Sequence, residues 1–350
     1  MGKMDFTLLG MVVLWYGSSV VCTNTAKELK MQGWSSGSLT VAELAIATGC
    51  SFVMMILLKL RPYKPPSMQF NELKLTIMLA TAFVFGFVTL NSAFGLMHVS
   101  LVMTVRATEP LFTMVAAKCF LGNEVVTIRI MLASLPIVIG AGLSALESAD
   151  ATLSGLVLVF VCNSCFAARG VTTKLLKEQF HVDDFSLFLN ICAIGTAVQC
   201  LNLGLMAVFF SGPAEEVQVV AEESSDTATE SDTKVDGASQ NLTMLINGVT
   251  FWAYLQLSWL VLGRVSAVTH SVLNSLRRPV ICTAGFLRFG GDPTALNITG
   301  IALASGGAVL YGQVKRTEMR RVERLQSTEE SARLTSGSKP GDIEKGGGGG

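Results

Sequence analysis

The sequence predicts an all-α membrane protein with ten transmembrane helices in two inverted five-helix halves. Three observations support this fold class: the scarcity of charge, ten long apolar segments and an internal repeat. Half of the 350 residues are hydrophobic and only 15% are charged, whereas water-soluble domains carry about 25% charged residues. Because a folded chain of this size still has a large surface to cover, we expect that surface to face lipid.

Ten segments are long and apolar enough to cross a hydrocarbon core of roughly 30 Å, which takes about 20 helical residues. They lie near residues 7–26, 39–60, 74–96, 98–121, 126–146, 151–172, 184–210, 242–262, 264–289 and 294–314. Residues 1–6 then form a short N-terminus, 7–146 the first half and 151–314 the second half. Two polar stretches are expected to be disordered, an acidic loop over 211–241 and a tail over 315–350.

The distribution of charge between the loops predicts the orientation in the membrane. Lysines and arginines gather in every second loop and in the tail, whereas the loop over 211–241 carries eight acidic residues and one lysine. Loops rich in Lys and Arg stay on the cytosolic side. Both termini are therefore predicted to be cytosolic, and an even number of spans agrees with this.

An internal repeat relates the two halves. The stretch VSLVMTVRATEPLF begins at Val99 in the fourth span, and VSAVTHSVLNSLRRPVI begins at Val265 in the ninth. Each continues into a Gly/Ala-rich span that contains IGAGLSA or ASGGAVL. With five spans in each half, the second copy is inverted relative to the first, an arrangement by which many carriers alternate around a midplane site.

Three arginines lie in the middle of predicted spans. Arg106 is in the fourth span, and Arg277 and Arg278 are in the ninth. An arginine at a helix centre costs about 2.5–3.5 kcal/mol on insertion scales, and guanidinium groups bind phosphate in a bidentate way. We therefore expect a polar cavity that binds an anion. The structural alternative for Arg106 is an ion pair with Glu109, three residues on; the ninth span holds no comparable carboxylate.

Other residues carry weaker indications. Tyr254, in the eighth span, is expected either to donate a hydrogen bond to the substrate or to pack in the core. Arg129 and Arg169 are expected to extend from span ends toward water. No HExxH or Walker motif and no intramembrane pair of aspartates is present. We therefore expect no enzyme activity, no catalytic residue, no metal and no cofactor.

The fourth and ninth spans carry a family resemblance. VSLVMTVRATEPLF and VSAVTHSVLNSLRRPV resemble the triose-phosphate translocator and nucleotide-sugar transporter family, within the drug/metabolite transporter superfamily, and CNSCFAARGVTTKLL from Cys162 is similar in style to its sixth span. The resemblance implies that Arg106, Arg277, Arg278 and Tyr254 occupy substrate-binding positions. Arginine replaces the family's lysine at the first two. No third-span His/Thr pair is found, and Thr89 and Asn91 are nearby polar candidates.

The resemblance implies an antiporter that exchanges a phosphorylated sugar or nucleotide sugar for phosphate or a nucleoside monophosphate. Two alternatives stay open, a phosphate/triose-phosphate translocator of a plastid envelope and a non-transport protein such as a channel or receptor. The expected partners are the phosphorylated substrate and the lipid bilayer, with no nucleic acid; a homodimer is an option. Sequons at Asn241 and Asn297 favour the Golgi or ER membrane, with the plastid envelope as the alternative.

Overall fold

A computed structural model describes residues 6–57, 70–121, 127–147, 151–180, 184–209, 237–262, 264–265, 267–290 and 294–337. All regular secondary structure within these ranges is helical, which confirms the all-α fold class. The elements are α1 (Phe6–Met31), α2 (Ser36–Leu57), α3 (Phe70–Leu96), α4 (Val99–Val105), η1 (Arg106–Thr108), α5 (Glu109–Leu121), α6 (Ile128–Glu147), α7 (Leu153–Phe180), α8 (Asp184–Phe209), α10 (Gly237–Leu262), α11 (Ala267–Phe289) and α12 (Ala295–Gly337).

Each predicted span corresponds to one helical segment, with α4, η1 and α5 together forming the fourth. Among the described residues, nine segments are long and apolar enough to cross a membrane. The remaining segment is α11, which contains three arginines in 23 residues and is therefore too polar by composition alone. Such a helix is stable in a bilayer when its charged side chains face the interior of the bundle.

The fourth span is broken at Arg106, where a continuous span was predicted. Pro110 has no N–H and cannot donate to the carbonyl of Arg106 four residues earlier. That carbonyl accepts a hydrogen bond from the backbone N–H of Glu109 instead, so the chain tightens into the 3₁₀ turn η1. The turn separates α4 from α5 in the middle of the span.

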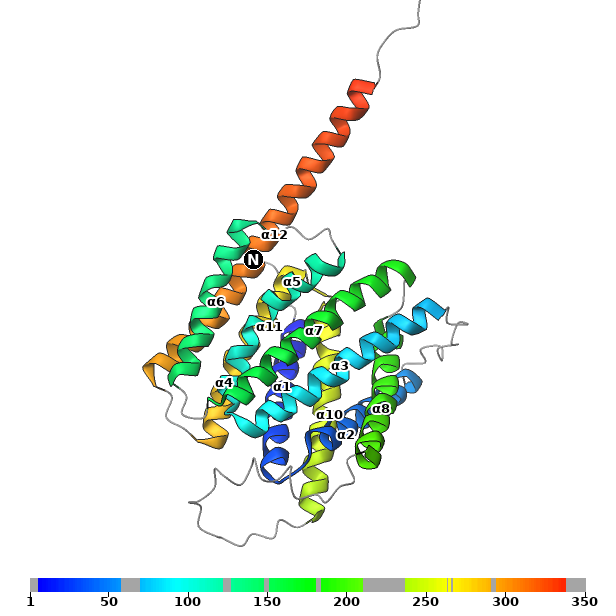
Figure 1. Ribbon diagram of the computed structural model, residues 1–350, viewed down its shortest axis with the longest axis vertical. Helices are drawn as coiled ribbons and strands as arrows, with labels where there is room; N and C mark the ends of the chain where they lie inside the picture. The colour runs from blue at the N-terminus through cyan, green and yellow to red at the C-terminus, as the bar shows by residue number, and fades with distance from the viewer. Residues whose placement is uncertain are drawn as a thin grey trace, which may run out of the picture.

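The packing of the helices is compatible with two inverted halves. In such an arrangement α1, α2, α3, α4–α5 and α6 correspond to α7, α8, α10, α11 and α12. Equivalent helices pack together in three cases, α2 with α8, α4 with α11 and α6 with α12. The contact of α1 with α10 corresponds in the same way to the contact of α3 with α7. Figure 1 shows α6 and α12 side by side at one edge of the bundle.

Small residues let α6 and α12 approach closely. A β-carbon on Gly140 would collide with the backbone nitrogen of Ala304, and one on Gly300 would lie 2.8 Å from the carbonyl oxygen of Gly140. Close backbone approach through small residues is a common way for membrane helices to associate. The Gly/Ala-rich stretches that mark the repeat in the sequence therefore form a contact between the halves.

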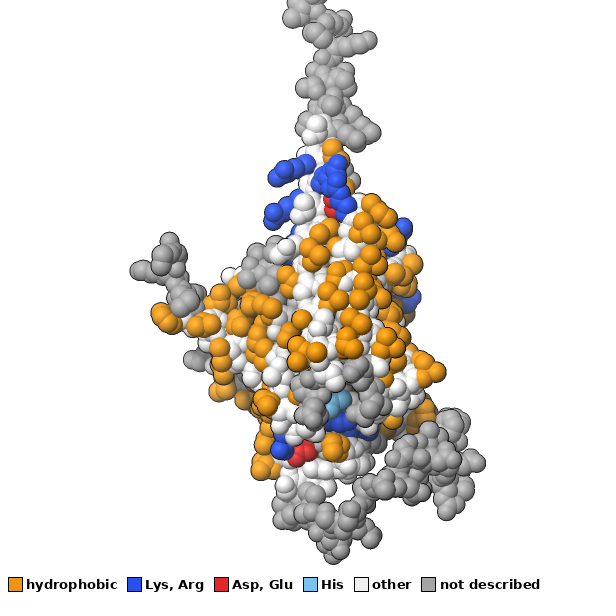
Figure 2. Space-filling model, turned by 90° about the vertical axis from the view of Figure 1, so that its left-hand side faces the viewer, with side chains coloured by type: hydrophobic (Ala, Val, Ile, Leu, Met, Phe, Trp, Pro, Cys, Tyr) orange, Lys and Arg blue, Asp and Glu red, His pale blue; other side chains and the backbone are white. Residues whose placement is uncertain are grey.

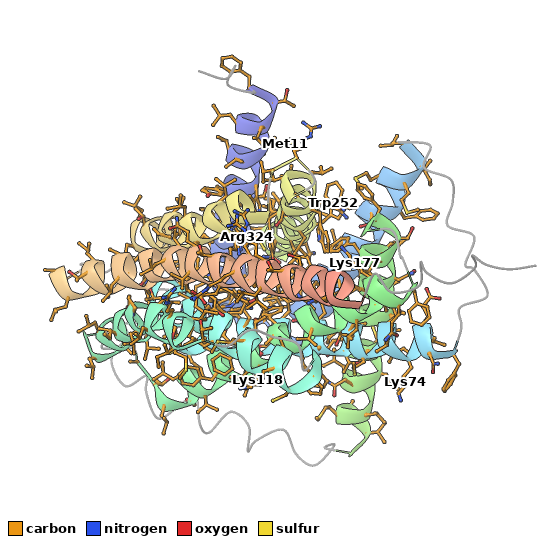
Figure 3. The ribbon with its side chains drawn as sticks, turned by 90° about the horizontal axis from the view of Figure 1, so that it is seen from above. Met11, Lys74, Lys118, Lys177, Trp252 and Arg324 are labelled. Atoms are coloured by element: carbon orange, nitrogen blue, oxygen red, sulfur yellow. The ribbon has the colours of Figure 1, made fainter. Side chains whose placement is uncertain are left out.

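The outer face of this helix pair is apolar. Its exposed side chains include Leu132, Leu135 and Ile139 of α6 and Ile298 and Leu310 of α12. Hydrophobic side chains cover much of the face drawn in Figure 2. An apolar exterior of this extent marks a surface that contacts lipid or protein. Seen from above, α12 is drawn in front of the other helices, with Lys118 on one side of it and Met11 and Trp252 on the other (Figure 3).

The predicted disordered tail over 315–350 is wrong for residues 315–337, because α12 continues to Gly337. Residues 315–336 contain no Gly or Pro and are rich in helix-forming Glu and Arg, some of them at helical i,i+3 spacing. Similarly, α10 begins at Gly237, inside the predicted loop over 211–241. Residues 1–5, 210–236 and 338–350 lie outside the described residues.

Figure 1 shows the start of α1 and the projecting part of α12 at the same end of the bundle, as an even number of spans requires. We call this the tail end. Its assignment to the cytosol rests on the loop charges and stays a prediction.

Candidate functional site

A cavity of about 200 Å³ lies among the helices of both halves. Its lining includes all four residues predicted from the sequence, Arg106, Arg277, Arg278 and Tyr254. Three further charged residues line it: Arg169, Glu43 and Glu109. The fold therefore brings the fourth and ninth spans together around one polar space, as the repeat predicted.

Arg106 is held by the carboxylate of Glu109. Its Nη2 lies 3.1 Å from the Glu109 Oε2, and its side chain is 14% exposed. The guanidinium carbon also lies 4.7 Å from the centroid of the Phe166 ring, close enough for a cation–π interaction. The ion pair suggested by the sequence spacing is thus present, and it is formed within the cavity.

Arg278 contacts the same carboxylate oxygen. Its Nη2 lies 3.2 Å from the Glu109 Oε2, and its side chain is 12% exposed. The ninth span itself holds no comparable carboxylate, so this partner of Arg278 was not expected from its neighbours in the sequence. The partner, Glu109, belongs to the fourth span, in the other half of the chain. One carboxylate bridges two arginines from the two halves.

Arg277 has a different environment. Its Nη1 donates a hydrogen bond to the hydroxyl of Ser19 at 2.9 Å. The guanidinium carbon lies 5.4 Å from the Trp15 ring and 5.5 Å from the Tyr254 ring. Tyr254 also packs edge-on against Phe251 at 5.7 Å. Tyr254 therefore has the packing role considered from the sequence, and as a lining residue it also remains a candidate for contact with substrate.

Arg169 was expected to extend toward water, and the structure corrects this. The residue lines the cavity, where its guanidinium carbon lies 5.0 Å from the ring of Phe166 and 5.6 Å from that of Phe83. The sixth span was predicted to end near residue 172, but α7 continues to Phe180, so Arg169 is more than two turns from its end. Arg129, by contrast, lies at the start of α6 and is 63% exposed.

Glu43 is a buried carboxyl group that the sequence reasoning missed. Glu43 is only 1% exposed, and its Oε2 accepts a hydrogen bond from Asn91 Nδ2 at 3.0 Å. The same nitrogen lies 3.1 Å from the hydroxyl of Thr40. In the sequence, Glu43 is recognisable only as a lone acidic residue within an apolar span. Of the two third-span candidates, Asn91 lines the cavity, whereas the Thr89 hydroxyl donates to its own helix.

Several donors of this cluster have no partner in the described part of the chain. Nε of Arg106, Nε of Arg277 and Nη1 of Arg278 are buried and make no hydrogen bond with a described residue. Four guanidinium and two carboxyl groups line the cavity, so positive charge exceeds negative by at least two. Unpaired buried donors are costly, and an anion with several oxygen atoms would satisfy both the donors and the charge.

This chain is similar to proteins of a known family. A model of the Triose-phosphate Transporter family matches residues 6–312. Phosphoenolpyruvate/phosphate translocator 3, chloroplastic, of Oryza sativa subsp. japonica is 29% identical, covering 88% of this chain and 74% of that protein. Triose phosphate/phosphate translocator, non-green plastid, chloroplastic, of Brassica oleracea var. botrytis is 27% identical over 90% of this chain and 75% of that protein.

The fold is also found in a solved structure titled "Crystal structure of protein". It superimposes with a TM-score of 0.55 at 13% identity and covers 89% of this chain and 96% of that one. This similarity concerns the fold alone. Together with the family match over nearly the whole helical region, the helices and the arginine cavity show that this chain is a multi-pass membrane protein of the Triose-phosphate Transporter family, a transporter and not an enzyme.

Proposed function

We propose that this protein is an antiporter that exchanges inorganic phosphate for a triose phosphate or phosphoenolpyruvate. The observation that carries the proposal is a set of buried guanidinium nitrogens on Arg106, Arg277 and Arg278 around one cavity, for which the described residues provide no hydrogen-bond partner. Guanidinium groups remain charged and offer paired donors that match the oxygens of phosphate. Phosphate is common to both exchanged species, so one site serves both directions of transport.

The size of the cavity favours a small substrate. Its volume is about 200 Å³, below the roughly 300–1,000 Å³ of pockets that hold drug-sized ligands. A nucleotide sugar, with a base, two sugars and two phosphates, needs more room. The relatives named above are translocators of triose phosphate or phosphoenolpyruvate with phosphate. We therefore favour these substrates over the nucleotide sugars considered from the sequence.

We assign different ends of the substrate to different residues. Arg106, Arg277 and Arg278 hold the phosphate, since each carries a buried donor that no described residue satisfies. Arg169 stacks on two aromatic rings and makes no ion pair with a described carboxylate, so it is available to the carboxylate or carbonyl group of the organic substrate. Tyr254 lines the cavity and is a candidate donor to the same end.

The charge of the cavity supports exchange over one-way transport. When the carrier changes conformation around the site, the arginines lose contact with water, and uncompensated charges are expensive to desolvate. Glu109 neutralises only part of this charge, because its single carboxylate is shared by Arg106 and Arg278. A bound phosphate lowers the cost of the transition, so the loaded carrier reorients faster than the carrier without an anion.

A counter-exchange panel in proteoliposomes tests the proposal. Vesicles are preloaded with phosphate, and uptake of labelled phosphate, triose phosphate, phosphoenolpyruvate and several nucleotide sugars is measured. We expect saturable uptake of the first three that requires the internal anion. Uptake of nucleotide sugars alone would overturn the substrate assignment. Conductance at channel rates, or binding of a partner protein without flux, would overturn the antiporter assignment.

For the compartment, we infer a plastid-type envelope in preference to the Golgi or ER. The two relatives described above carry the word chloroplastic in their names. One of the two sequons that favoured the secretory pathway is inaccessible, because Asn297 is 8% exposed and its Oδ1 accepts a hydrogen bond from Ser144. Glycosidase treatment should leave the mobility of the protein unchanged, and a shift abolished by Asn241→Gln would contradict this inference.

A further inference from the structure

A second cavity, of about 340 Å³, adjoins the central one. Glu109, Asn274 and Arg278 line both cavities. The second cavity is otherwise lined by η1, α5, α11 and α12, whereas no described residue of α12 lines the central cavity. The Glu109–Arg278 ion pair, at 3.2 Å, therefore belongs to the wall between the two.

The α12 side of this cavity is cationic. Lys315 and Arg316 line it together with Arg278, and Glu109 is the one carboxylate among its described lining residues. Nη1 of Arg278 is buried and has no partner among the described residues. The described lining residues thus include three cations and one carboxylate, beside a donor of Arg278 that no described residue satisfies. The central cavity has the same features.

Two contacts hold α12 in place over this cavity. The hydroxyl of Tyr311 donates to the carbonyl of Pro110 at 3.3 Å, which ties α12 to the start of α5. Arg129 of α6 lies 3.0 Å from Glu318. Lysine and arginine side chains gather where α12 leaves the bundle (Figure 2), so the cavity lies toward the tail end, which the loop charges assign to the cytosol.

We propose that this second cavity is an anion-binding site, in which Lys315, Arg316 and Arg278 bind the phosphate group of a substrate on its way between the tail end and the central cavity. The proposal rests on the proposed function for the identity of the anion. Arg278 lines both cavities, so the phosphate can keep one guanidinium contact while it passes. For passage, the Arg278–Glu109 pair opens and the phosphate oxygens replace the carboxylate.

The position of Lys315 and Arg316 sets them apart from the other cations of the tail. Arg320 and Arg321 lie about one turn further along α12, are exposed, and do not line the cavity. A general electrostatic attraction of anions to the tail would depend on all four residues. Of these four, a binding site formed by the second cavity would depend on Lys315 and Arg316 alone. The double variants K315Q/R316Q and R320Q/R321Q remove equal charge from the same helix and form a matched pair.

Side-specific kinetics in proteoliposomes of known orientation test this site. For K315Q/R316Q we expect the KM for phosphate offered at the tail end to rise at least about tenfold, the lower end of the effect of one lost charge-assisted hydrogen bond. The KM at the opposite end should stay unchanged, as should both values in R320Q/R321Q. Equal effects of the two double variants, or equal effects at both ends, would overturn the proposal. The single variants K315Q and R316Q replace the double variant if it does not fold.

Direct binding separates this proposal from the proposed function. Equilibrium dialysis of the purified wild-type protein with labelled phosphate should give two sites per chain, and K315Q/R316Q should give one. Failure of the wild type to exchange phosphate would refute the proposed function. Retention of two sites by K315Q/R316Q would refute the second site. An anionic lipid headgroup offers similar oxygens and a net negative charge, whereas the phosphatidylcholine headgroup is zwitterionic. The dialysis is therefore repeated in phosphatidylcholine vesicles with and without phosphatidylglycerol, and loss of the second site with phosphatidylglycerol would assign it to lipid.

Discussion

Replacement of Arg277 by alanine tests the phosphate site most directly. Arg277 lines the central cavity, and its Nε is buried without a partner in the described part of the chain. Its only hydrogen bond with a described residue is the one to Ser19, at 2.9 Å. Because no described carboxylate forms an ion pair with this arginine, its loss should affect anion binding more than the integrity of the fold.

The expected magnitude follows from these contacts. A hydrogen bond to a charged group contributes about 1.5–3 kcal/mol, so the loss of one should weaken phosphate binding by about 10- to 150-fold. The cation–π contacts with Trp15 and Tyr254 contribute about 0.5–2 kcal/mol. Their loss is opposed by the removal of a buried unpaired charge, so the net change in stability should be small. Arg277→Lys should retain part of the affinity, since a point charge still attracts phosphate.

The measurement is a thermal-shift titration with phosphate, together with phosphate exchange in proteoliposomes. Arg288→Ala is the matched control, because Arg288 lies on the same helix, is 59% exposed and pairs with Glu28 at the surface, where ion pairs contribute about 0–1 kcal/mol. The control should bind phosphate like the wild type. Undiminished stabilisation of Arg277→Ala by phosphate would refute the reasoning, and so would an equal loss in Arg288→Ala.

Three further predictions address the supporting residues. Glu109→Gln removes the carboxylate that competes with phosphate for Arg106 and Arg278, so KM and kcat for exchange should both fall; a rise in KM would contradict this. Tyr254→Phe keeps the ring contacts, so thermal stability should hold while the KM for the organic phosphate rises severalfold and phosphate–phosphate exchange is unchanged; equal effects on both exchanges would exclude a contact with the organic end. Gly140→Ala brings a β-carbon against α12 and should destabilise the fold by about 1–3 kcal/mol, whereas Gly142→Ala, which meets open space, should not; equal unfolding temperatures would refute the close contact.

The sequence predicted the helical spans well because apolar length is a local property. The fourth and ninth spans were also paired correctly, since the repeat was readable around Arg106 and Arg277. The break at η1 could have been expected from Pro110, whose missing N–H acts on the carbonyl of Arg106. Helix length was harder to predict, because α7 and α12 extend as amphipathic or charged helices beyond their apolar segments.

The composition of the site was predicted less completely, because it depends on contacts between distant segments. Glu109 was recognised as a neighbour of Arg106 in the sequence, but its contact with Arg278 joins residues 169 positions apart. Arg169 was assigned to a span end because the span was estimated too short. Glu43 stands alone in an apolar helix, and only the fold shows that Asn91 stabilises it and that it lines the cavity.

The shared carboxylate of Glu109 bears on how such a carrier can release its substrate. If all the cavity arginines were available to phosphate, several charge-assisted hydrogen bonds would act together and dissociation would be slow. In the structure Glu109 pairs with Arg106 and Arg278. If phosphate binds these arginines as proposed, its net binding energy is reduced by the energy of the contacts that it displaces. The same carboxylate joins Arg106 of the fourth span and Arg278 of the ninth, so in the proposed mechanism phosphate binding breaks a contact between these spans. The proposed exchange would therefore couple affinity and conformational change through Glu109.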